Sequence, residues 1–233
     1  MARSEKPQAL SSALLKELHT LFDADHMRTD HVERKMYSHD IGTMPKLVSP
    51  FIPNGLAGAV VRPQSTEEVQ KLMALANKYH VALVPRGMAT SGYGGALPTK
   101  GAIVVDLTML HGVKNIDAEN LEVTVEAGAI WEQVDRVIKK EGLTLRLYPS
   151  SYPSSTVAGW LAQGGSGFGS YEYGTFAENV VSVKVVTPDG MLNHFEGQDL
   201  LDIIADAEGI TGIIVEVTFK VRPLEDEAHR MLS

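Results

Sequence analysis

The segment from Arg86 to Gly95, which reads RGMATSGYGG, carries the residue types most suited to chemistry. It directly follows the strand-like run VALVP and combines glycines with Thr90, Ser91 and an arginine. Glycine permits positive φ and lets the backbone approach a ligand closely, and successive backbone N–H groups in such a turn form a concave anion site. The segment therefore suits a phosphate or pyrophosphate. For a glycine-rich stretch that stands alone, a plain hairpin-like surface loop is the alternative.

Two common nucleotide-binding motifs do not explain this first loop. A P-loop needs Gly-Lys-Ser or Gly-Lys-Thr at the start of a helix, and neither tripeptide occurs in the sequence. A Rossmann fingerprint places GxGxxG between the first strand and its helix, whereas these glycines follow the second predicted strand and precede no helix. Any phosphate would therefore be held by backbone N–H groups without a helix dipole behind it. Gly87 and Gly94 are expected to need unusual φ values.

A second loop, residues 148–174, reads YPSSYPSSTVAGWLAQGGSGFGSYEYG and is rich in glycine and serine. Ser154 or Ser155 is expected to cap a short helix, TVAGWLAQ, and GGSGFGS supplies another run of backbone N–H groups. An irregular loop of this length in a compact domain usually has a function. Two phosphate-friendly loops in one chain indicate a large, two-ended ligand.

Composition excludes several function classes. The chain has 233 residues, a formal net charge of −8 and no cysteine, and its pI is about 5.5. We therefore expect no nucleic-acid partner, and disulfides, thiolate nucleophiles and an iron–sulfur cluster of its own are excluded. The eight histidines show no ligand spacing, so no metal site is expected. No apolar run is long enough to span a membrane, so direct membrane insertion is not expected. The absence of cysteine fits a reducing cytoplasm, so a cytoplasmic location is expected.

The first predicted lobe holds the first loop on a parallel unit. A helix is expected over 11–22, capped by Ser11 or Ser12, followed by an arm up to residue 56. The strand AVVRP, the helix STEEVQKLMALANKYH and the strand VALVP then predict a parallel βαβ unit. The strand AIVVDLTML follows, with Asp106 capping the turn at its end. These elements make a small parallel lobe over about 57–112.

The second predicted lobe, about 113–223, is larger and mostly antiparallel. It contains a strand LEVTVEAG, a helix AIWEQVDRVIKKEG that stops at Gly142 and a strand LTLRLYP. A hairpin over 179–195 turns at Pro188-Asp189-Gly190, and the helix DLLDIIADAEG precedes the long strand ITGIIVEVTFKVRP. The predicted fold class is α+β with two α+β lobes, and residues 224–233 form a tail.

These segments, from Val60 to Pro223, resemble in order the FAD-binding domain of the vanillyl-alcohol oxidase and p-cresol methylhydroxylase (PCMH-type) superfamily. The resemblance is strongest to its branch with glycolate oxidase and D-lactate dehydrogenase flavin subunits. It rests on VVRPQSTEEVQKLMALANKYHVALVPRG, RGMATSGYGGALP, VVDLTMLHGVKNID, VTVEAGAIWEQV, PSSYPSSTVAGWLAQGGSGFGSYEYGTFAENVVSVKVVTPDG and DAEGITGIIVEVTFKVRP.

The resemblance implies FAD as the cofactor, with the first loop around its pyrophosphate and the second over its ring system. Backbone around Gly209 to Ile214 would close the other side. The implied cofactor-binding residues are Arg86, Gly87, Met88, Ala89, Thr90, Ser91, Gly92, Gly94, Pro149, Ser150, Ser155, Thr156, Gly159, Gly164, Gly165, Ser166, Gly167, Tyr173, Gly174, Glu208, Gly209, Ile213 and Ile214.

Several positions depart from the family pattern. Ala89 and Ala158 stand where glycine is usual, and Met88 is bulky for its place. In covalent members a histidine in the first loop bonds the flavin, whereas the matching residue here is Thr90. The chain also lacks cysteine, so the FAD is expected to be non-covalent.

The resemblance further implies a flavin-dependent dehydrogenase acting on a small 2-hydroxy acid such as lactate or glycolate. In the family a substrate or cap domain follows the FAD-binding domain, and we expect it to be absent from this chain. A partner subunit is therefore expected to carry the cap part, an iron–sulfur centre or another electron acceptor, and to bring the chain to a membrane surface where that is needed. No catalytic base is assigned. The alternatives are a non-catalytic flavin-binding electron-transfer or assembly subunit, and a nucleotide-sugar reductase, which needs a further substrate domain.

Overall fold

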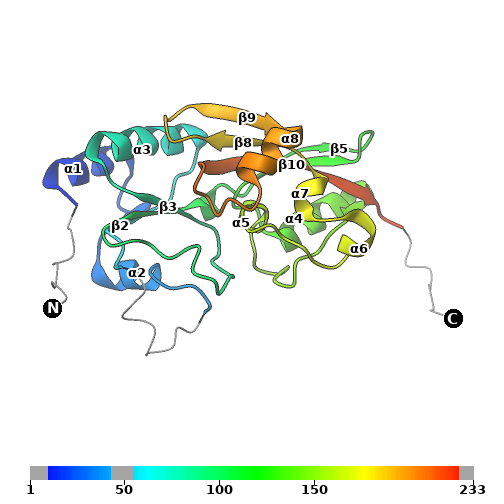
Figure 1. Ribbon diagram of the computed structural model, residues 1–233, viewed down its shortest axis with the longest axis horizontal. Helices are drawn as coiled ribbons and strands as arrows, with labels where there is room; N and C mark the ends of the chain where they lie inside the picture. Colours follow the sequence, from blue (N-terminus) through cyan, green and yellow to red (C-terminus); the bar gives the residue numbers. More distant parts are fainter. Residues whose placement is uncertain (1–9, 43–54, 226–233) are drawn as a thin grey trace.

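The computed structural model describes residues 10–42 and 55–225 as two β-sheets with helices packed around them. Figure 1 shows the smaller sheet with β2 and β3 at the left and the larger sheet with β8 to β10 toward the right. The smaller sheet is mainly parallel and the larger sheet is antiparallel. The predicted α+β class, with one parallel and one antiparallel lobe, is confirmed.

The smaller sheet has the order β1-β2-β4-β3. β2 and β3 run parallel to the central β4, and β1 pairs antiparallel with β2. The helix α3 connects β2 to β3, which makes the predicted βαβ unit. The bounds are β1 Met27–Arg28, β2 Ala59–Val61, α3 Thr66–Tyr79, β3 Leu83–Arg86 and β4 Ile103–Asp106.

Two helices cover this sheet as their sequences predict. α1 (Ser12–Leu21) is capped by Ser11, whose side chain accepts a hydrogen bond from the Leu14 N–H. Ser65 caps α3 in the same way, and the apolar face of α3 is buried from Val69 to Ala76. At the end of β4, Asp106 caps the turn as predicted, because its side chain accepts from the Thr108 N–H. These caps satisfy backbone donors that a helix start leaves without partners.

The larger sheet has the order β5-β6-β10-β8-β9, and β7 pairs with the far end of β10. From Val215 onward, the long strand β10 alternates buried positions with partly or fully exposed ones, which is the pattern of a strand with one face on the core. The bounds are β5 Val113–Asp117, β6 Glu122–Glu126, β7 Leu143–Leu145, β8 Val180–Val186, β9 Leu192–Glu196 and β10 Ile213–Pro223.

The helices of this lobe are short. The bounds are α4 Trp131–Ile138, α5 Val157–Ala162, α6 Ser170–Tyr173, α7 Phe176–Asn179 and α8 Gly197–Asp199, with a 3-10 turn at Lys139–Glu141 and a π-helix at Leu200–Ile204. Another 3-10 turn, Leu107–Met109, follows β4 in the smaller lobe. An aromatic cluster anchors α5. Trp160, which belongs to α5, stacks on Phe176 at 5.2 Å between ring centroids and packs edge-to-face with Trp131.

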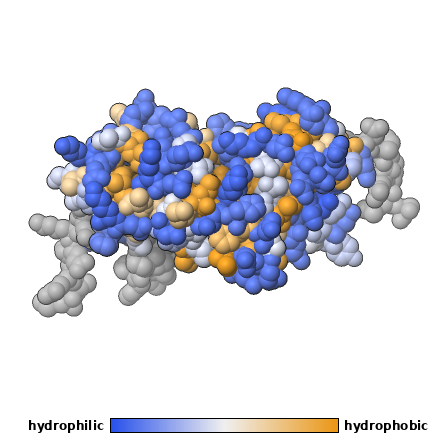
Figure 2. Space-filling model, turned by 90° about the horizontal axis from the view of Figure 1, so that it is seen from above, coloured by the Kyte–Doolittle hydropathy of each residue, from blue (hydrophilic) through white to orange (hydrophobic). Residues whose placement is uncertain are grey.

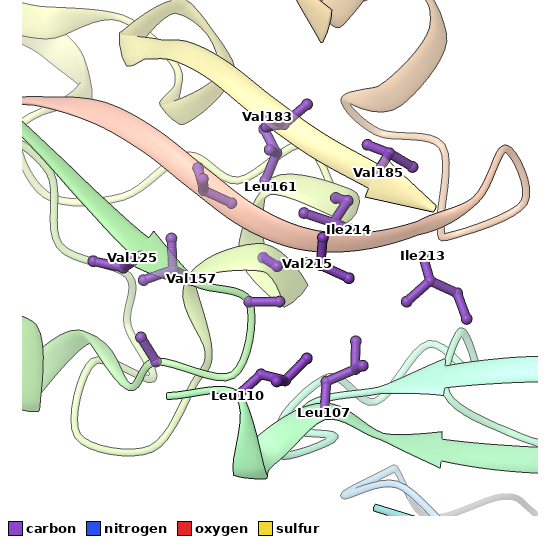
Figure 3. Packing of buried hydrophobic residues seen from close by; sticks show 14 of the residues in the cluster. Leu107, Leu110, Val125, Val157, Leu161, Val183, Val185, Ile213, Ile214 and Val215 are labelled. Carbon is purple, nitrogen blue, oxygen red and sulfur yellow. The ribbon is translucent and has the colours of Figure 1, made fainter. Parts of the chain in front are cut away.

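One hydrophobic core joins the two sheets. Leu107 and Leu110, just after β4, belong to the same buried cluster as Ile213 and Val215 at the start of β10. Figure 3 shows these side chains where the two sheets approach one another. Because interiors are close-packed, this shared core fixes the loops at the ends of β3, β4 and β10 relative to each other.

Some local predictions were wrong. The arm contains β1 and α2 (His31–Met36), which has no buried face and so gives no helical apolar pattern. The residue before α5 is Thr156, without a side-chain capping bond, whereas the Ser155 hydroxyl donates to the Ser151 carbonyl instead. The predicted helix before β10 ends at Ile204. Residues 43–54 of the predicted arm, the first residues of the chain and most of the predicted tail lie outside the described ranges.

The face in Figure 2 is mostly hydrophilic, with hydrophobic side chains gathered in separate patches. In the ranges that the structure covers, no helix has the length and apolar character needed to cross a bilayer.

Candidate functional site

A cavity of about 510 Å³ lies where the end of β3, the start of α5 and the loop before β10 meet. Most of the predicted site residues line it. They are Arg86, Gly87, Met88, Ala89, Thr90, Ser91, Pro149, Ser150, Ser155, Thr156, Gly159, Gly164, Gly165, Ser166, Glu208, Gly209 and Ile214.

Other predicted residues lie outside the cavity lining, namely Gly92, Gly94, Gly167, Tyr173, Gly174 and Ile213. Their surroundings explain this. Gly167 packs against the Tyr148 carbonyl, where a Cβ would lie 2.2 Å away. The Tyr173 ring lies under the Arg146 guanidinium, 5.5 Å from it, and Ile213 is 2% exposed within the core.

The cavity is also lined by residues that were not among the predicted cofactor-binding residues. They are Pro85, Tyr93, Gly95, Ala96, Leu107, Ala127, Ser151, Ala158, Trp160, Ala162, Gln163 and Gly212. Small and apolar residues dominate this set, and Leu107 and Ala127 belong to the buried hydrophobic core. Most of them belong to the two glycine-rich loops or to the segment from Gly209 to Ile214. Pro85, Ala96, Leu107 and Ala127 are marked only by their position next to these segments in space, which a single sequence does not show.

The first loop presents backbone donors. The N–H groups of Met88, Ala89, Thr90 and Ser91 make no hydrogen bond to any other described residue. Ala89, at a position where the resemblance leads us to expect glycine, adopts the left-handed conformation with φ of 49°. When a left-handed residue alternates with right-handed ones, successive backbone N–H groups turn toward the same side and can bind one anion.

Two of the four glycines of this loop, Gly87 and Gly94, serve different purposes. Gly94 has φ of 91°, as predicted. The prediction for Gly87 was wrong, because its φ is not positive; a Cβ at Gly87 would instead lie 2.2 Å from Thr156 Oγ1. Gly87 is therefore required for the close approach of the first loop to the start of α5.

The Arg86 guanidinium is held by the protein. It donates to the His39 carbonyl at 2.8 Å and lies 5.0 Å from the centre of the Tyr37 ring. Burial lowers the pKa of the Arg86 guanidinium below its ordinary value. The side chain lines the cavity while its charge is engaged by the arm.

A buried carboxylate positions the second loop. Asp135 on α4 is 1% exposed, and it accepts hydrogen bonds from the Tyr152 hydroxyl at 2.8 Å and from Thr144 Oγ1 at 3.0 Å. Burial and the bond to Asp135 raise the pKa of the Tyr152 phenol. Tyr152 lies in the turn between Pro149 and Ser155, both of which line the cavity, so this pair fixes that wall.

The third wall is a segment with unusual backbone. Asp206 and Glu208 have φ of 55° and 51°, and Gly209, with φ of 77°, packs against Pro85. Backbone held in this region by its surroundings often marks a functional site. The Glu208 carboxylate faces the first loop, because a Cβ at Gly95 would lie 2.3 Å from Glu208 Oε2.

The chemistry of the lining favours binding over acid–base catalysis. Of the described residues that line the cavity, the titratable ones are Arg86, Tyr93 and Glu208, and none is histidine. The described ranges contain no cluster of histidine and carboxylate side chains that could hold a metal ion. The remaining walls are backbone N–H groups, hydroxyls and apolar surfaces such as Ala158, Trp160 and Ile214.

Comparison with known proteins identifies this arrangement. The family model described as FAD binding domain matches residues 57–196. A mitochondrial D-lactate dehydrogenase [cytochrome] of Arabidopsis thaliana is 33% identical over 219 residues, which cover 91% of this chain and 37% of that protein. The glycolate oxidase subunit GlcD of Bacillus subtilis is 28% identical, covering 86% of this chain and 43% of the subunit.

A different enzyme is about equally similar. An alkyldihydroxyacetonephosphate synthase of Dictyostelium discoideum is 29% identical, covering 89% of this chain and 36% of the synthase. A solved structure of an alkyldihydroxyacetonephosphate synthase superposes with a TM-score of 0.83 at 26% identity, covering 94% of this chain and 42% of that one. The chain thus spans less than half the length of these relatives.

The cavity fits the cofactor that the family model names. Free N–H groups at Met88 to Ser91 suit the two phosphates of FAD. The apolar walls around Trp160 and Ile214 suit flat rings, and the close approach at Gly87 brings the two kinds of wall together. The chain therefore belongs to the FAD-binding domain family, as its sequence indicates, and its cofactor is FAD.

Proposed function

We propose that this chain is the FAD-binding part of a flavin-dependent dehydrogenase that oxidises a small 2-hydroxy acid of the lactate or glycolate type. The observation that carries the proposal is the cavity, which joins a phosphate-binding loop to apolar walls and has few titratable side chains. Similarity to the D-lactate dehydrogenase and the glycolate oxidase subunit supports the substrate class.

The described residues supply binding and positioning. FAD, when bound, supplies the acceptor for a hydride. The first loop would hold the phosphates of FAD, and the walls at Trp160 and Ile214 would shield its rings. Oxidation of a 2-hydroxy acid also needs a base for the hydroxyl proton and a clamp for the carboxylate.

The base and the clamp are proposed to lie outside the described residues. Arg86, the cationic side chain in the lining, is already engaged by His39 and Tyr37. Glu208 is the carboxylate in the lining and faces the first loop. We therefore assign substrate handling and electron transfer to a cap part or a partner subunit that carries an iron–sulfur or other redox centre. The alternative to a catalytic subunit is a subunit that binds the flavin without catalysing the oxidation and serves in electron transfer or assembly.

A second candidate function follows from a separate observation. Synthases named alkyldihydroxyacetonephosphate synthase from Dictyostelium discoideum, Caenorhabditis elegans and Trypanosoma brucei are 27% to 31% identical to this chain over most of its length. An FAD-binding part of such a synthase would use the same cavity for the same cofactor.

The test is anaerobic reduction of the bound flavin in the native assembly by a panel of 2-hydroxy acids. Bleaching of the flavin absorbance by lactate or glycolate within the assay is the expected result. Flavin that stays oxidised with every acid would contradict the dehydrogenase function. If the same assembly forms an alkyldihydroxyacetonephosphate, the second candidate is favoured.

A further inference from the structure

The arm after α2 crosses the first loop and bonds to it. One carboxylate oxygen of Asp40 accepts from the Gly94 N–H at 2.9 Å, and the other accepts from the Gly42 N–H at 2.8 Å. Gly42 also lies close to Gly92, because a Cβ at Gly42 would be 2.6 Å from the Gly92 carbonyl oxygen. Asp40 itself is not part of the cavity lining.

A second contact ties the other end of the loop to the same arm. Arg86, at the start of the loop, donates to the His39 carbonyl at 2.8 Å. The arm therefore contacts the loop at both ends, near Arg86 and at Gly94, while the N–H groups of Met88 to Ser91 between these points remain without partners among the described residues.

The arm is firmly anchored on the smaller sheet. The Tyr37 hydroxyl donates to Asp106 Oδ2 at 2.5 Å, and Asp106 is 3% exposed. Arg62 donates to the Tyr37 hydroxyl at 3.1 Å and forms an ion pair with Glu33 on α2. Buried, charge-assisted hydrogen bonds of this kind keep a single geometry because breaking them leaves a buried charge without its partner.

We propose that Asp40 is a positioning residue for the cofactor: it holds the first loop in the conformation that directs free N–H groups at the pyrophosphate of FAD. Asp40 bonds the loop from outside the cavity lining, whereas the carboxylate that lines the cavity is that of Glu208. The inference rests on the first loop being the pyrophosphate loop. Under this proposal the glycine-rich sequence of the loop is not sufficient for FAD binding, because the loop also needs Asp40 of the arm to keep its conformation.

The experiment measures the dissociation constant and the dissociation rate of FAD for the 233-residue chain and for Asp40→Ala. Removing the carboxylate should weaken FAD binding about tenfold, mainly through faster dissociation. Asp40→Asn keeps one acceptor oxygen, so its FAD affinity should lie between those of the unmodified chain and of Asp40→Ala. ADP, which carries a pyrophosphate without the flavin, should lose affinity in the same order.

The matched control is Asp117→Ala. Asp117 also caps a turn by accepting backbone N–H groups, from Glu119 and Asn120, and it is not among the cavity-lining residues. FAD affinity should stay within twofold of that of the unmodified chain. Equal weakening by Asp40→Ala and Asp117→Ala would overturn the inference, because it would show a general loss of stability.

Gly87→Val separates this inference from the assignment of the loop. If Gly87→Val loses FAD while Asp40→Ala binds normally, the role of Asp40 is wrong and the loop assignment stands. If Gly87→Val also binds normally, the loop assignment fails and the inference fails with it. Should Asp40→Ala not fold, Asp40→Asn is judged by the same criterion, and unchanged FAD affinity in it overturns the proposal. None of these measurements depends on which substrate the enzyme oxidises.

Discussion

Gly87 and Thr156 lie so close together that a Cβ on the glycine would be 2.2 Å from the threonine Oγ1. Gly87 belongs to the first loop, and Thr156 directly precedes α5 at the second loop. Both line the cavity. This close approach sets the distance between the first loop, to which we assign the phosphates, and the side of the cavity with apolar walls.

Gly87→Ala is therefore expected to push the two loops apart. Overpacking of this kind costs about 1–3 kcal/mol, which corresponds to a loss of about five- to 150-fold in FAD affinity. Adding Thr156→Ala removes the threonine Oγ1 and leaves the Cβ of residue 156 as the nearest atom, 3.2 Å from the new Cβ at position 87. The double variant should therefore recover part of the FAD affinity. Fluorescence titration with FAD measures both effects.

Gly197→Ala is the control for this pair. A Cβ at Gly197 would meet nothing within 4 Å, and its φ of 55° adds only backbone strain. Its FAD affinity should equal that of the unmodified chain. Failure of Thr156→Ala to restore any binding to Gly87→Ala would argue against the contact as the reason for the glycine.

The flavin is predicted to be non-covalent. The family resemblance places Thr90 at the position of the linking histidine. The described residues that line the cavity include no histidine, and the chain has no cysteine. Acid precipitation should release all the flavin into the supernatant, and the intact mass of the protein should be that of the chain alone. A yellow precipitate with a flavin adduct in the mass spectrum would show the prediction to be wrong.

The glycine-rich loops could be predicted from the sequence because their signal is local. The need for glycine at position 87 was predicted for the wrong reason, since the neighbouring Thr156 is distant in the chain and a single sequence does not show that contact. Asp40 was missed for the same reason, because it lies 54 residues from Gly94. The arm's helix α2 was missed because it buries no side chain, and hydrophobic periodicity detects only helices with a buried face.

Tyr152→Phe tests the support of the second loop. The variant loses one hydrogen bond to the Asp135 carboxylate, which should lower the free energy of unfolding by about 1–2 kcal/mol. FAD should also bind several-fold more weakly, because the turn that carries Pro149 and Ser155 loses its anchor. Denaturant unfolding and FAD titration measure the two effects.

Tyr79→Phe is the matched control for that variant. Tyr79 donates the same kind of bond, to the Glu17 carboxylate at 2.5 Å, and it does not line the cavity. The free energy of unfolding should fall, with FAD affinity unchanged. Equal loss of FAD affinity in both tyrosine variants would mean that Tyr152 acts through overall stability alone.

The chain by itself is predicted to oxidise 2-hydroxy acids slowly. Its described lining holds few titratable side chains, and orientation of the hydride donor contributes much of the barrier reduction in such reactions. A strong artificial reductant should still reduce the bound flavin, because that reaction needs only access. Stopped-flow reduction by lactate and glycolate should be far slower for the chain alone than for its native assembly. Equal, fast reduction in both would place a complete substrate site within these 233 residues.

The location of the FAD site is tested most directly by amide NMR of the 25.3 kDa chain during titration with FAD. The signals of Met88 to Ser91 and of Ser166 should shift and saturate at one FAD per chain, because their N–H groups face no other described acceptor. Those of the turn from Asp117 to Asn120 should stay in place. Saturating shifts that avoid both glycine-rich loops, or no saturable shift at all, would contradict the assignment of the cavity as the FAD site.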